Sequence, residues 1–374
     1  MIVRGGLKLY HICIDVYQGG EKMAQKNYTN ERFAALRKLL RKNKLDGFIV
    51  TNNLDQFYLT NFFFYPNEAV FLVHKKGVTC FTRELYVEPF GKFAPQMEVI
   101  GDENRIVSAI AKARKLGLAR PGFDAAKETY VSGGLLRASG FVEAGSFITT
   151  LRETKDAAEL KILRESNRIA YLTYEYIKPR VKTGMTEFEV AAEMEKFMRA
   201  HGATTTSFYT IVAFGENAAN PHHETSARKL KAEDAVLMDF GCIYKGYCSD
   251  ITRSWWHGKK EPAEYTKIWN IVDKARKQGI KAVGVGVPCK KVDATSRGII
   301  SAAGYGEYYM HGTGHGVGIE IHEEPYNSQQ SSSVLAEGNI VTVEPGIYLP
   351  GKFGVRLEDT MAVSKTGAKI LTKK

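Results

Sequence analysis

The chain has few cysteines and no long apolar run, and both shortages exclude classes of protein. Its five cysteines are scattered over 374 residues without a C-x-x-C pair, so we expect reduced thiols and no disulfide framework. No segment approaches the roughly 20 apolar residues of a membrane helix. The first seventeen residues are interrupted by Lys8, His11 and Asp15, and no small-residue cleavage site follows them. These features predict a cytoplasmic protein without a membrane segment.

Acidic residues are the minority charge, and the net charge is +11. The lysines and arginines are spread over the whole length, however, and no RNA- or DNA-binding motif accompanies them. We therefore expect a solvated basic surface and no nucleic-acid partner. Hydrophobic residues make up 44% of the chain and charged residues 25%, which is typical of folded soluble domains.

The length favours two domains, preceded by an extension. We expect residues 1–27 to be this extension and translation to start at Met23, because codons for Gly19, Gly20 and Glu21 would be purine-rich, as a ribosome-binding site is. An intact mass that begins at Met1 would contradict this start. Residues 28–150 alternate helix and strand, beginning with an amphipathic helix before Asn43 and buried strands at 47–51, 69–74 and 78–82. They predict a small α/β domain.

Residues 151–374 have a different pattern. A long helix is predicted from Thr154 to a point before Pro179, and Thr186 with Glu189 forms a capping box for the next helix, which Gly202 ends. Further helices are expected at 263–278 and 293–303, and strands within 208–214, 235–256, 315–322, 339–349 and 354–363. Because the strands cluster around hairpins, this region predicts an α+β fold with an antiparallel sheet.

Two aspartates lie on a predicted hairpin in this second region. Asp239 and Asp250 are on strand-like runs, and a loop of Tyr244 and Lys245 would place them directly opposite each other. Two carboxylates so placed repel each other unless a proton or a cation lies between them. A single aspartate would be interpreted as a turn or cap residue, but the pair indicates a metal site.

A histidine cluster and two glutamates follow. Three of the nine histidines, His311, His315 and His322, lie within twelve residues, and glycines beside His315 would let the backbone approach a ligand. Glu344 and Glu358 are inside or at the end of apolar strand-like runs, where an unpaired charge is costly. A salt bridge from Arg356 to Glu358 is the alternative explanation, but it leaves the other carboxylates unexplained.

The set Asp239, Asp250, His315, Glu344 and Glu358, at intervals of 11, 65, 29 and 14 residues, resembles the pita-bread metallopeptidases. This is the family of prolidase, Xaa-Pro aminopeptidase and methionine aminopeptidase. The run from Asp55 to Thr60 also resembles the creatinase-type N-terminal domain, although Asn61 stands where the family usually has glycine. The resemblance implies a pita-bread catalytic domain over 151–374 and a creatinase-type domain over 28–150.

The resemblance also implies roles. Asp239 would bind one of two divalent cations, His315 and Glu344 the other, and Asp250 and Glu358 would bridge them. Oxygen-rich ligands suit Mn²⁺, with Co²⁺ or Zn²⁺ as alternatives. His222, seventeen residues before Asp239, and His322 would bind the substrate or its tetrahedral intermediate, and Glu344 would shuttle a proton to the leaving nitrogen. The residues expected to orient these groups are His311, Tyr348 and Arg356.

Three functions remain open at this point. The segment Gly215 to His223 favours an Xaa-Pro aminopeptidase acting on short peptides, with an Xaa-Pro dipeptidase as the alternative. A non-catalytic pita-bread module that binds peptides or proteins is the candidate from a different class, and retention of all five ligands argues against it. Creatinase-like hydrolysis without metals is disfavoured for the same reason. The family commonly forms homodimers, so we expect one here.

Overall fold

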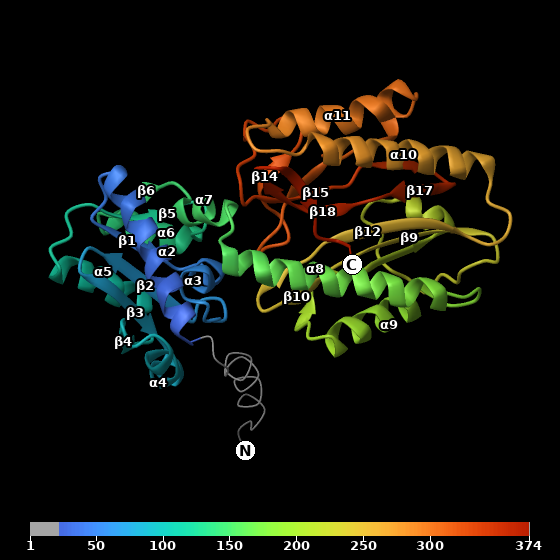
Figure 1. Cartoon of the computed structure of the whole chain (residues 1–374). Helices are drawn as coiled ribbons and strands as arrows, with labels where there is room; N and C mark the ends of the chain where they lie inside the picture. The colour runs from blue at the N-terminus through green and yellow to red at the C-terminus, as the bar shows by residue number, and fades with distance from the viewer. Residues whose placement is uncertain (1–21, 374) are drawn as a thin grey trace, which may run out of the picture. The chain divides into compact units, whose positions relative to one another are not determined.

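The computed structural model describes residues 22–373, with side chains from Asn30 onward, as two compact units that divide between Arg152 and Glu153 (Figure 1). Residues 1–21, which include most of the predicted extension, lie outside the described residues. None of the helices in the described part combines the length and apolar character needed to cross a bilayer.

The first unit contains one mixed six-stranded sheet in the order β4-β3-β2-β1-β5-β6. The strands are β1 (Gly47–Val50), β2 (Ala69–His74), β3 (Gly77–Thr82), β4 (Glu98–Gly101), β5 (Pro121–Asp124) and β6 (Val142–Ala144). The helices are α2 (Lys22–Lys42), α3 (Asn53–Thr60), α4 (Glu84–Phe93), α5 (Arg105–Lys115), α6 (Tyr130–Ala138) and α7 (Phe147–Glu153). The predicted alternation of helix and strand is confirmed.

Asn61 shows why the glycine expected after Leu59 and Thr60 can be replaced. It ends α3 in the left-handed conformation, with φ 58°, and its backbone N–H donates to the carbonyl of Phe57. Asparagine adopts this conformation more readily than most other residues that carry a side chain. Its side-chain oxygen also accepts a hydrogen bond from Arg32 at 3.1 Å. The departure from the family pattern therefore leaves the helix end intact.

The second unit places its strands between two pairs of helices (Figure 1). The helices are α8 (Ala157–Ile177), α9 (Glu187–Ala200), α10 (Ala263–Ala282) and α11 (Cys289–Ala302), with short 3₁₀ turns η1 (Lys178–Arg180), η2 (Gly215–Ala219) and η3 (Gly306–Tyr308). Apolar residues of α8 and α9 pack on the strands around β9, and those of α10 and α11 pack on the later strands. The fold class is mixed α and β, as predicted.

The strands of this unit form four small, mostly antiparallel sheets, in the orders β11-β10-β7, β12-β9-β8, β14-β13-β15-β18-β19 and β16-β17. They are β7 (Thr205–Thr206), β8 (Ile211–Phe214), β9 (Asp234–Phe240), β10 (Cys242–Tyr244), β11 (Tyr247–Cys248), β12 (Ile251–His257), β13 (Gly314–Gly316), β14 (Glu323–Asn327), β15 (Ile340–Val343), β16 (Gly346–Leu349), β17 (Phe353–Arg356), β18 (Asp359–Ser364) and β19 (Gly367–Ile370).

Several predicted boundaries hold and others are wrong. The capping box of Thr186 and Glu189 is present, and Gly202 follows α9 with φ +99°. The helix predicted from Asp293 begins at Cys289, because Pro288 precedes its first turn. The strand predicted over 315–322 is wrong: only 314–316 is extended before β14 begins at Glu323, and the pairing of β13 with β14 is irregular.

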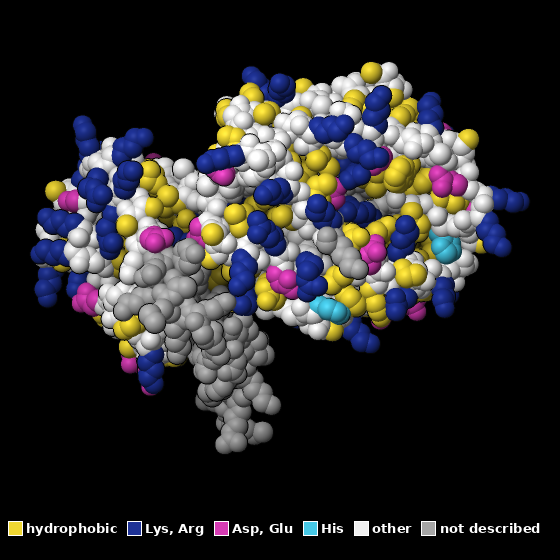
Figure 2. Space-filling model, in the orientation of Figure 1, with side chains coloured by type: hydrophobic (Ala, Val, Ile, Leu, Met, Phe, Trp, Pro, Cys, Tyr) yellow, Lys and Arg dark blue, Asp and Glu magenta, His cyan; other side chains and the backbone are white. Residues whose placement is uncertain are grey.

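Lys and Arg side chains are spread over the visible face of the molecule (Figure 2).

Candidate metal centre

Five acidic and imidazole side chains from distant segments gather inside the second unit. They come from β9, from the connection between β11 and β12, from β13, from the end of β15 and from the turn between β17 and β18: Asp239, Asp250, His315, Glu344 and Glu358, here called the five-residue cluster. Ligand atoms of Asp250, His315 and Glu358 lie within 4.8 Å of one another. His315 Nε2 is also 3.3 Å from Glu344 Oε1. The sequence therefore identified residues that the fold brings together.

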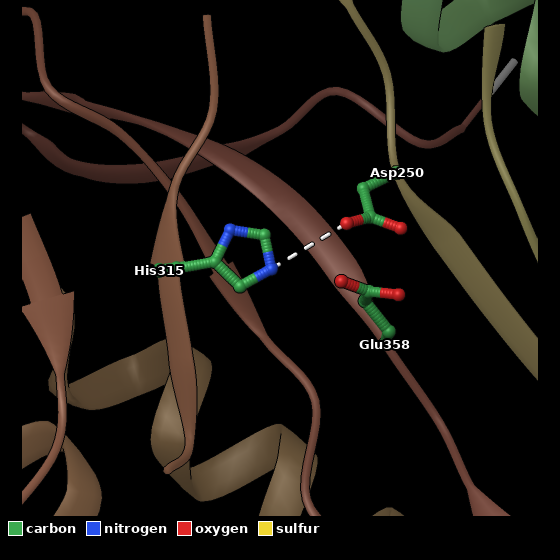
Figure 3. Close-up of side chains that lie close together, drawn as sticks. All are labelled: Asp250, His315 and Glu358. Atoms are coloured by element: carbon green, nitrogen blue, oxygen red, sulfur yellow. Dashed lines mark ion pairs between the residues drawn. The ribbon is translucent and has the colours of Figure 1, made fainter. Parts of the chain in front are cut away.

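The imidazole of His315 presents a lone pair to this cluster. Its Nδ1 is 3.0 Å from the carbonyl oxygen of Gly316, and a carbonyl only accepts, so Nδ1 carries the proton. In the neutral ring, Nε2 is then an acceptor that faces Asp250 Oδ2 at 3.5 Å (Figure 3). It also lies 3.3 Å from Glu344 Oε1. Three acceptors at these distances repel one another unless a proton or a cation lies between them. This is the tautomer of a metal-binding histidine.

The carboxylates of the cluster are crowded. Burial, together with the neighbouring charges of Glu358, Asp239 and Glu344, raises the pKa of Asp250 well above its usual range. Burial and the charges of Glu344 and Asp239 raise the pKa of Glu358 in the same way. Burial also acts to raise the pKa of Glu344 and to lower that of His315. In the metal-free protein a proton on Nε2 of His315 takes the place of a cation and donates to Glu344, which outweighs burial, raises the pKa of His315 and lowers that of Glu344 to about 2. Divalent cations would remove this repulsion.

Two buried oxygen atoms of the cluster lack any hydrogen-bond donor within the described residues. They are Asp239 Oδ1 and Glu358 Oε1. The other oxygen of each group is bonded: Arg356 donates to Asp239 Oδ2 at 2.6 Å, and Thr252 donates to Glu358 Oε2 at 2.8 Å. Buried oxygens of this kind are costly unless they coordinate a cation. The residues present therefore fit a divalent metal site with oxygen and imidazole ligands.

The predicted hairpin register is wrong by two residues. Asp239 is opposite Thr252, and Asp250 lies just outside the paired residues of β12. The turn contains Lys245 and Gly246, with φ of 48° and 82°, and Tyr244 pairs with Tyr247. A two-residue hairpin turn of this type needs positive φ at both positions, and glycine adopts it most easily. A shift of two residues preserves the side of the sheet that each side chain faces, so the carboxylates still converge.

Glycines beside His315 have a different role from the predicted one. A Cβ added to Gly314 would lie 2.0 Å from the carbonyl oxygen of Thr342, and one added to Gly316 would lie 2.4 Å from that of Glu324. The glycines therefore allow neighbouring strands to approach the backbone of His315 closely. This packing is sufficient to explain both glycines.

Buried threonines that the sequence reasoning missed support the cluster. Each lies two residues from one of its members and is fully buried: Thr252, Thr313, Thr342 and Thr360. The hydroxyl of Thr252 donates to Glu358, and that of Thr342 accepts from the backbone of His315. Residues two apart on a strand face the same side. A threonine two positions from a candidate ligand is therefore the sequence pattern that could have predicted these contacts.

His311, Tyr348 and Arg356 form one hydrogen-bonded chain. Nδ1 of His311 donates to the carbonyl of Gly312, so its Nε2 accepts from the hydroxyl of Tyr348 at 2.8 Å. Arg356 donates to that hydroxyl at 2.8 Å and to Asp239 at 2.6 Å. Burial raises the pKa of Tyr348 to about 12 and lowers the pKa of His311. Arg356 thus pairs with Asp239, and the alternative salt bridge to Glu358 is wrong.

Two further histidines lie beside the cluster. The ring of His322 packs edge-on against that of His315, with centroids 4.4 Å apart. Burial lowers the pKa of His322, as do the nearby His315 and, to a smaller extent, His222. His222 is exposed, whereas Nε2 of its neighbour His223 is 2.8 Å from the buried Glu187. His222 is therefore the one of the two that is accessible to a peptide.

Comparison with known proteins agrees with this geometry. A model of metallopeptidase family M24 matches residues 161–365, and a model of the creatinase/prolidase N-terminal domain matches residues 32–154. The peptidase YqhT of Bacillus subtilis is 35% identical over 343 residues, which cover 90% of this chain and 96% of that protein.

Solved structures give the same picture. The chain is similar to the Xaa-Pro dipeptidase from Bacillus anthracis, with 37% identity, a TM-score of 0.88 and coverage of 92% of this chain and 98% of that one. The prolidase from Pyrococcus furiosus is 30% identical, with a TM-score of 0.81 and coverage of 90% of this chain and 99% of that one. The X-Pro aminopeptidase from Thermotoga maritima MSB8 is 28% identical, with a TM-score of 0.80 and coverage of 88% of this chain and 96% of that one. The chain belongs to metallopeptidase family M24, the pita-bread peptidases, and carries the creatinase/prolidase N-terminal domain of that family.

Proposed function

We propose that the chain is an Xaa-Pro dipeptidase that uses two divalent cations. The observation that supports this function is the five-residue cluster, in a chain that is 37% identical to a solved Xaa-Pro dipeptidase over 92% of its length. This proposal replaces the preference for an aminopeptidase that the segment Gly215 to His223 suggested. The Xaa-Pro dipeptidase from Bacillus anthracis, at 37% identity, is more similar to the chain than the X-Pro aminopeptidase, at 28%.

The proposed ligands divide between two cations. Asp239 would hold one, His315 and Glu344 the other, and Asp250 and Glu358 would bridge them, which uses the lone pair of His315 and the two unbonded carboxylate oxygens. When bound, such a pair of cations lowers the pKa of a water molecule and stabilises negative charge on the attacked carbonyl. Mn²⁺ suits these ligands, and Co²⁺ or Zn²⁺ are the alternatives.

The remaining residues would bind the substrate and move a proton. A proline nitrogen has no N–H in the peptide bond, so it must be protonated as that bond breaks. We propose Glu344 as the carboxylate that takes up a proton and delivers it to this nitrogen. His222 and His322, beside the cluster, would donate hydrogen bonds to the scissile carbonyl as negative charge develops on it. His311, Tyr348 and Arg356 would hold Asp239 in place through their hydrogen-bonded chain.

The cellular location and the oligomeric state of the enzyme are also proposals. The buried free thiols of Cys80, Cys242, Cys248 and Cys289 support a reducing, cytoplasmic location, because disulfides are rare there. A homodimer is the proposed assembly, and light scattering coupled to size-exclusion chromatography measures it.

Peptide length separates the two peptidase functions. The enzyme is treated with a chelator, reloaded with Mn²⁺ and given Ala-Pro and Ala-Pro-Ala in parallel. We expect metal-dependent cleavage of Ala-Pro and slower or no cleavage of Ala-Pro-Ala. The X-Pro aminopeptidase similarity favours the opposite preference as the second candidate. Failure to cleave either peptide with metal would contradict both.

A further inference from the structure

Glu187, the first residue of α9, is a buried carboxylate outside the five-residue cluster. Its side chain is fully buried and accepts five hydrogen bonds. Oε1 accepts from the backbone N–H of Phe214 and from the side chain of Asn217, both at 2.9 Å. Oε2 accepts from the backbone N–H of Ser226 at 2.9 Å, from its hydroxyl at 2.6 Å and from His223 at 2.8 Å. A single carboxylate thus satisfies donors from four residues.

These donors bracket one segment of the chain. Phe214 ends β8 and Ser226 lies after His223, so residues 215–225, here called the His222 loop, leave and return at the same carboxylate. Asn217 ties η2 in the middle of the loop to the same point. A loop held at both ends and twice inside, at Asn217 and His223, has far fewer conformations than a free one of this length. Glu187 is therefore positioned to determine where the His222 loop lies.

The same contacts distinguish the two adjacent histidines. A carboxylate only accepts hydrogen bonds, so Nε2 of His223 carries a proton and donates to Glu187. Neighbouring side chains leave the backbone in different directions, so anchoring His223 to the interior leaves His222 on the exposed side. The anchor thus acts on the residue next to the one that the proposed reaction uses.

Glutamine cannot replace this carboxylate without loss. An amide offers one accepting oxygen, whereas the donors approach both oxygens of Glu187. The NH₂ group of the glutamine would face at least two N–H or O–H donors and could accept from none of them. The hydrogen bonds that remain would also be weaker, because a neutral acceptor binds donors less strongly than a charged one. The volume of the side chain stays nearly the same, so packing around α9 is retained.

We propose that Glu187 is a positioning residue for His222: it holds the His222 loop, through His223 and Ser226, so that His222 faces the scissile carbonyl. The inference rests on the proposed function, because that function gives His222 its role. None of the five hydrogen bonds that Glu187 accepts comes from the five-residue cluster.

The test combines kinetics with a double-mutant cycle on the full-length, Mn²⁺-loaded enzyme and Ala-Pro as substrate. We expect His222→Ala to lower kcat/KM about 100-fold, as removal of a donor to the developing oxyanion does. Glu187→Gln should lower it about tenfold, the effect of one misplaced hydrogen bond to a charged group. In the double variant kcat/KM should stay within about threefold of that of His222→Ala, because there is no imidazole left to position.

Glu159→Gln is the matched control. Glu159 is also buried near the start of a helix, α8, and accepts from the hydroxyl of Tyr247 at 3.0 Å and from the backbone of Asp156 at 2.9 Å. These two partners, Tyr247 and Asp156, lie outside the His222 loop. We expect this variant to lower the melting temperature while kcat/KM changes by less than about threefold.

Hydrogen exchange supplies a readout that needs no substrate. Amides of residues 214–226 should exchange faster in Glu187→Gln than in the wild type, with metal content unchanged. A double variant tenfold below His222→Ala, or unchanged exchange in 214–226, would overturn the role of Glu187. Absence of Ala-Pro cleavage by the wild-type enzyme would instead overturn the proposed function, so the two failures are distinguishable.

Discussion

Glu358 and Asp359 are adjacent in the chain and almost fully buried, yet their substitution should have opposite effects on the metal-free protein. Glu358 lies close to Asp250, and burial together with the charges of Glu344 and Asp239 raises its pKa. Asp359 accepts hydrogen bonds from two arginines, Arg253 at 2.9 Å and Arg276. One carboxylate therefore opposes the fold unless a cation is present, whereas the other stabilises it without one.

The expected size follows from distance. The ligand atoms of Asp250, His315 and Glu358 lie within 4.8 Å of one another. Two unit charges at such a separation repel by about 3–4 kcal/mol at an effective dielectric constant of about 20. Proton uptake by the pair removes part of this repulsion, since the pKa of both carboxyls is raised. Glu358→Gln should therefore raise the free energy of unfolding of the metal-free protein by about 1–3 kcal/mol.

The amide keeps the contact that Glu358 already makes. Its oxygen can accept from Thr252, as Oε2 does now at 2.8 Å, and its NH₂ group can donate toward the carboxylate of Asp250. The substitution thus exchanges a repulsion for a hydrogen bond and leaves the volume unchanged. It also removes one of the two proposed bridging ligands.

Calorimetry with and without metal measures both effects. In chelator, the melting temperature of Glu358→Gln should exceed that of the wild type, by about 2–4 °C for each kcal/mol. Mn²⁺ at about 1,000 times its dissociation constant stabilises the wild type by about 4.1 kcal/mol, and it should stabilise the variant much less. The order of the two proteins should therefore reverse when metal is added.

Asp359→Asn is the control and should behave in the opposite way. It leaves Arg253 without this charged partner and Arg276 with Asp273 alone, and breaking a buried pair costs about 3–5 kcal/mol. Its stabilisation by Mn²⁺ should remain. A metal-free Glu358→Gln that is less stable than the metal-free wild type, or equal stabilisation of both by Mn²⁺, would refute the reasoning about the cluster.

Three further changes test other parts of the structure. Tyr348→Phe removes the hydroxyl that accepts from Arg356, and should lower kcat/KM about tenfold while metal content, measured by mass spectrometry, is unchanged. Gly246→Ala forces a side chain onto a φ of +82° and should cost about 1 kcal/mol in thermal unfolding. The hydrogen bond from Arg228 lowers the pKa of Glu216 from 4.5 to about 2. Its stabilisation is therefore complete above pH 4.5 and lost as the pH falls to about 2. Since Glu216 is half exposed, the gap between wild type and Glu216→Gln in urea unfolding of the metal-free proteins should be about 1 kcal/mol or less, and should close over that range.

Local patterns in the sequence were enough for most of the helices and strands and for the members of the cluster. The capping box of Thr186 and Glu189 is a contact over three residues, so the spacing alone predicts it. Charged residues inside apolar strands, such as Asp239 and Glu358, stand out because burial of a lone charge is costly. The roles of individual ligands were expected from family resemblance, and they remain proposals.

Contacts between distant segments could not be predicted in this way. Arg356 lies two residues from Glu358, which suggested a pair, but its guanidinium reaches Asp239, 117 positions away. The five donors to Glu187 come from residues 27 to 39 positions later, and each is an ordinary polar group. The identity of a polar residue does not specify which carboxylate it will bind, because that contact depends on how strands and loops pack.

The hairpin between β9 and β12 shows why a prediction can be wrong in register and still identify the right cluster. Side chains alternate between the two faces of a strand, so a shift of two residues changes every opposing pair and leaves every face unchanged. Asp239 is opposite Thr252 and not Asp250, yet both carboxylates face the same interior. A shift of one residue would have turned one of them away. What the alternation of residues specifies is therefore the face that carries the charges, while the positive φ of Lys245 and Gly246 specifies which residues are paired.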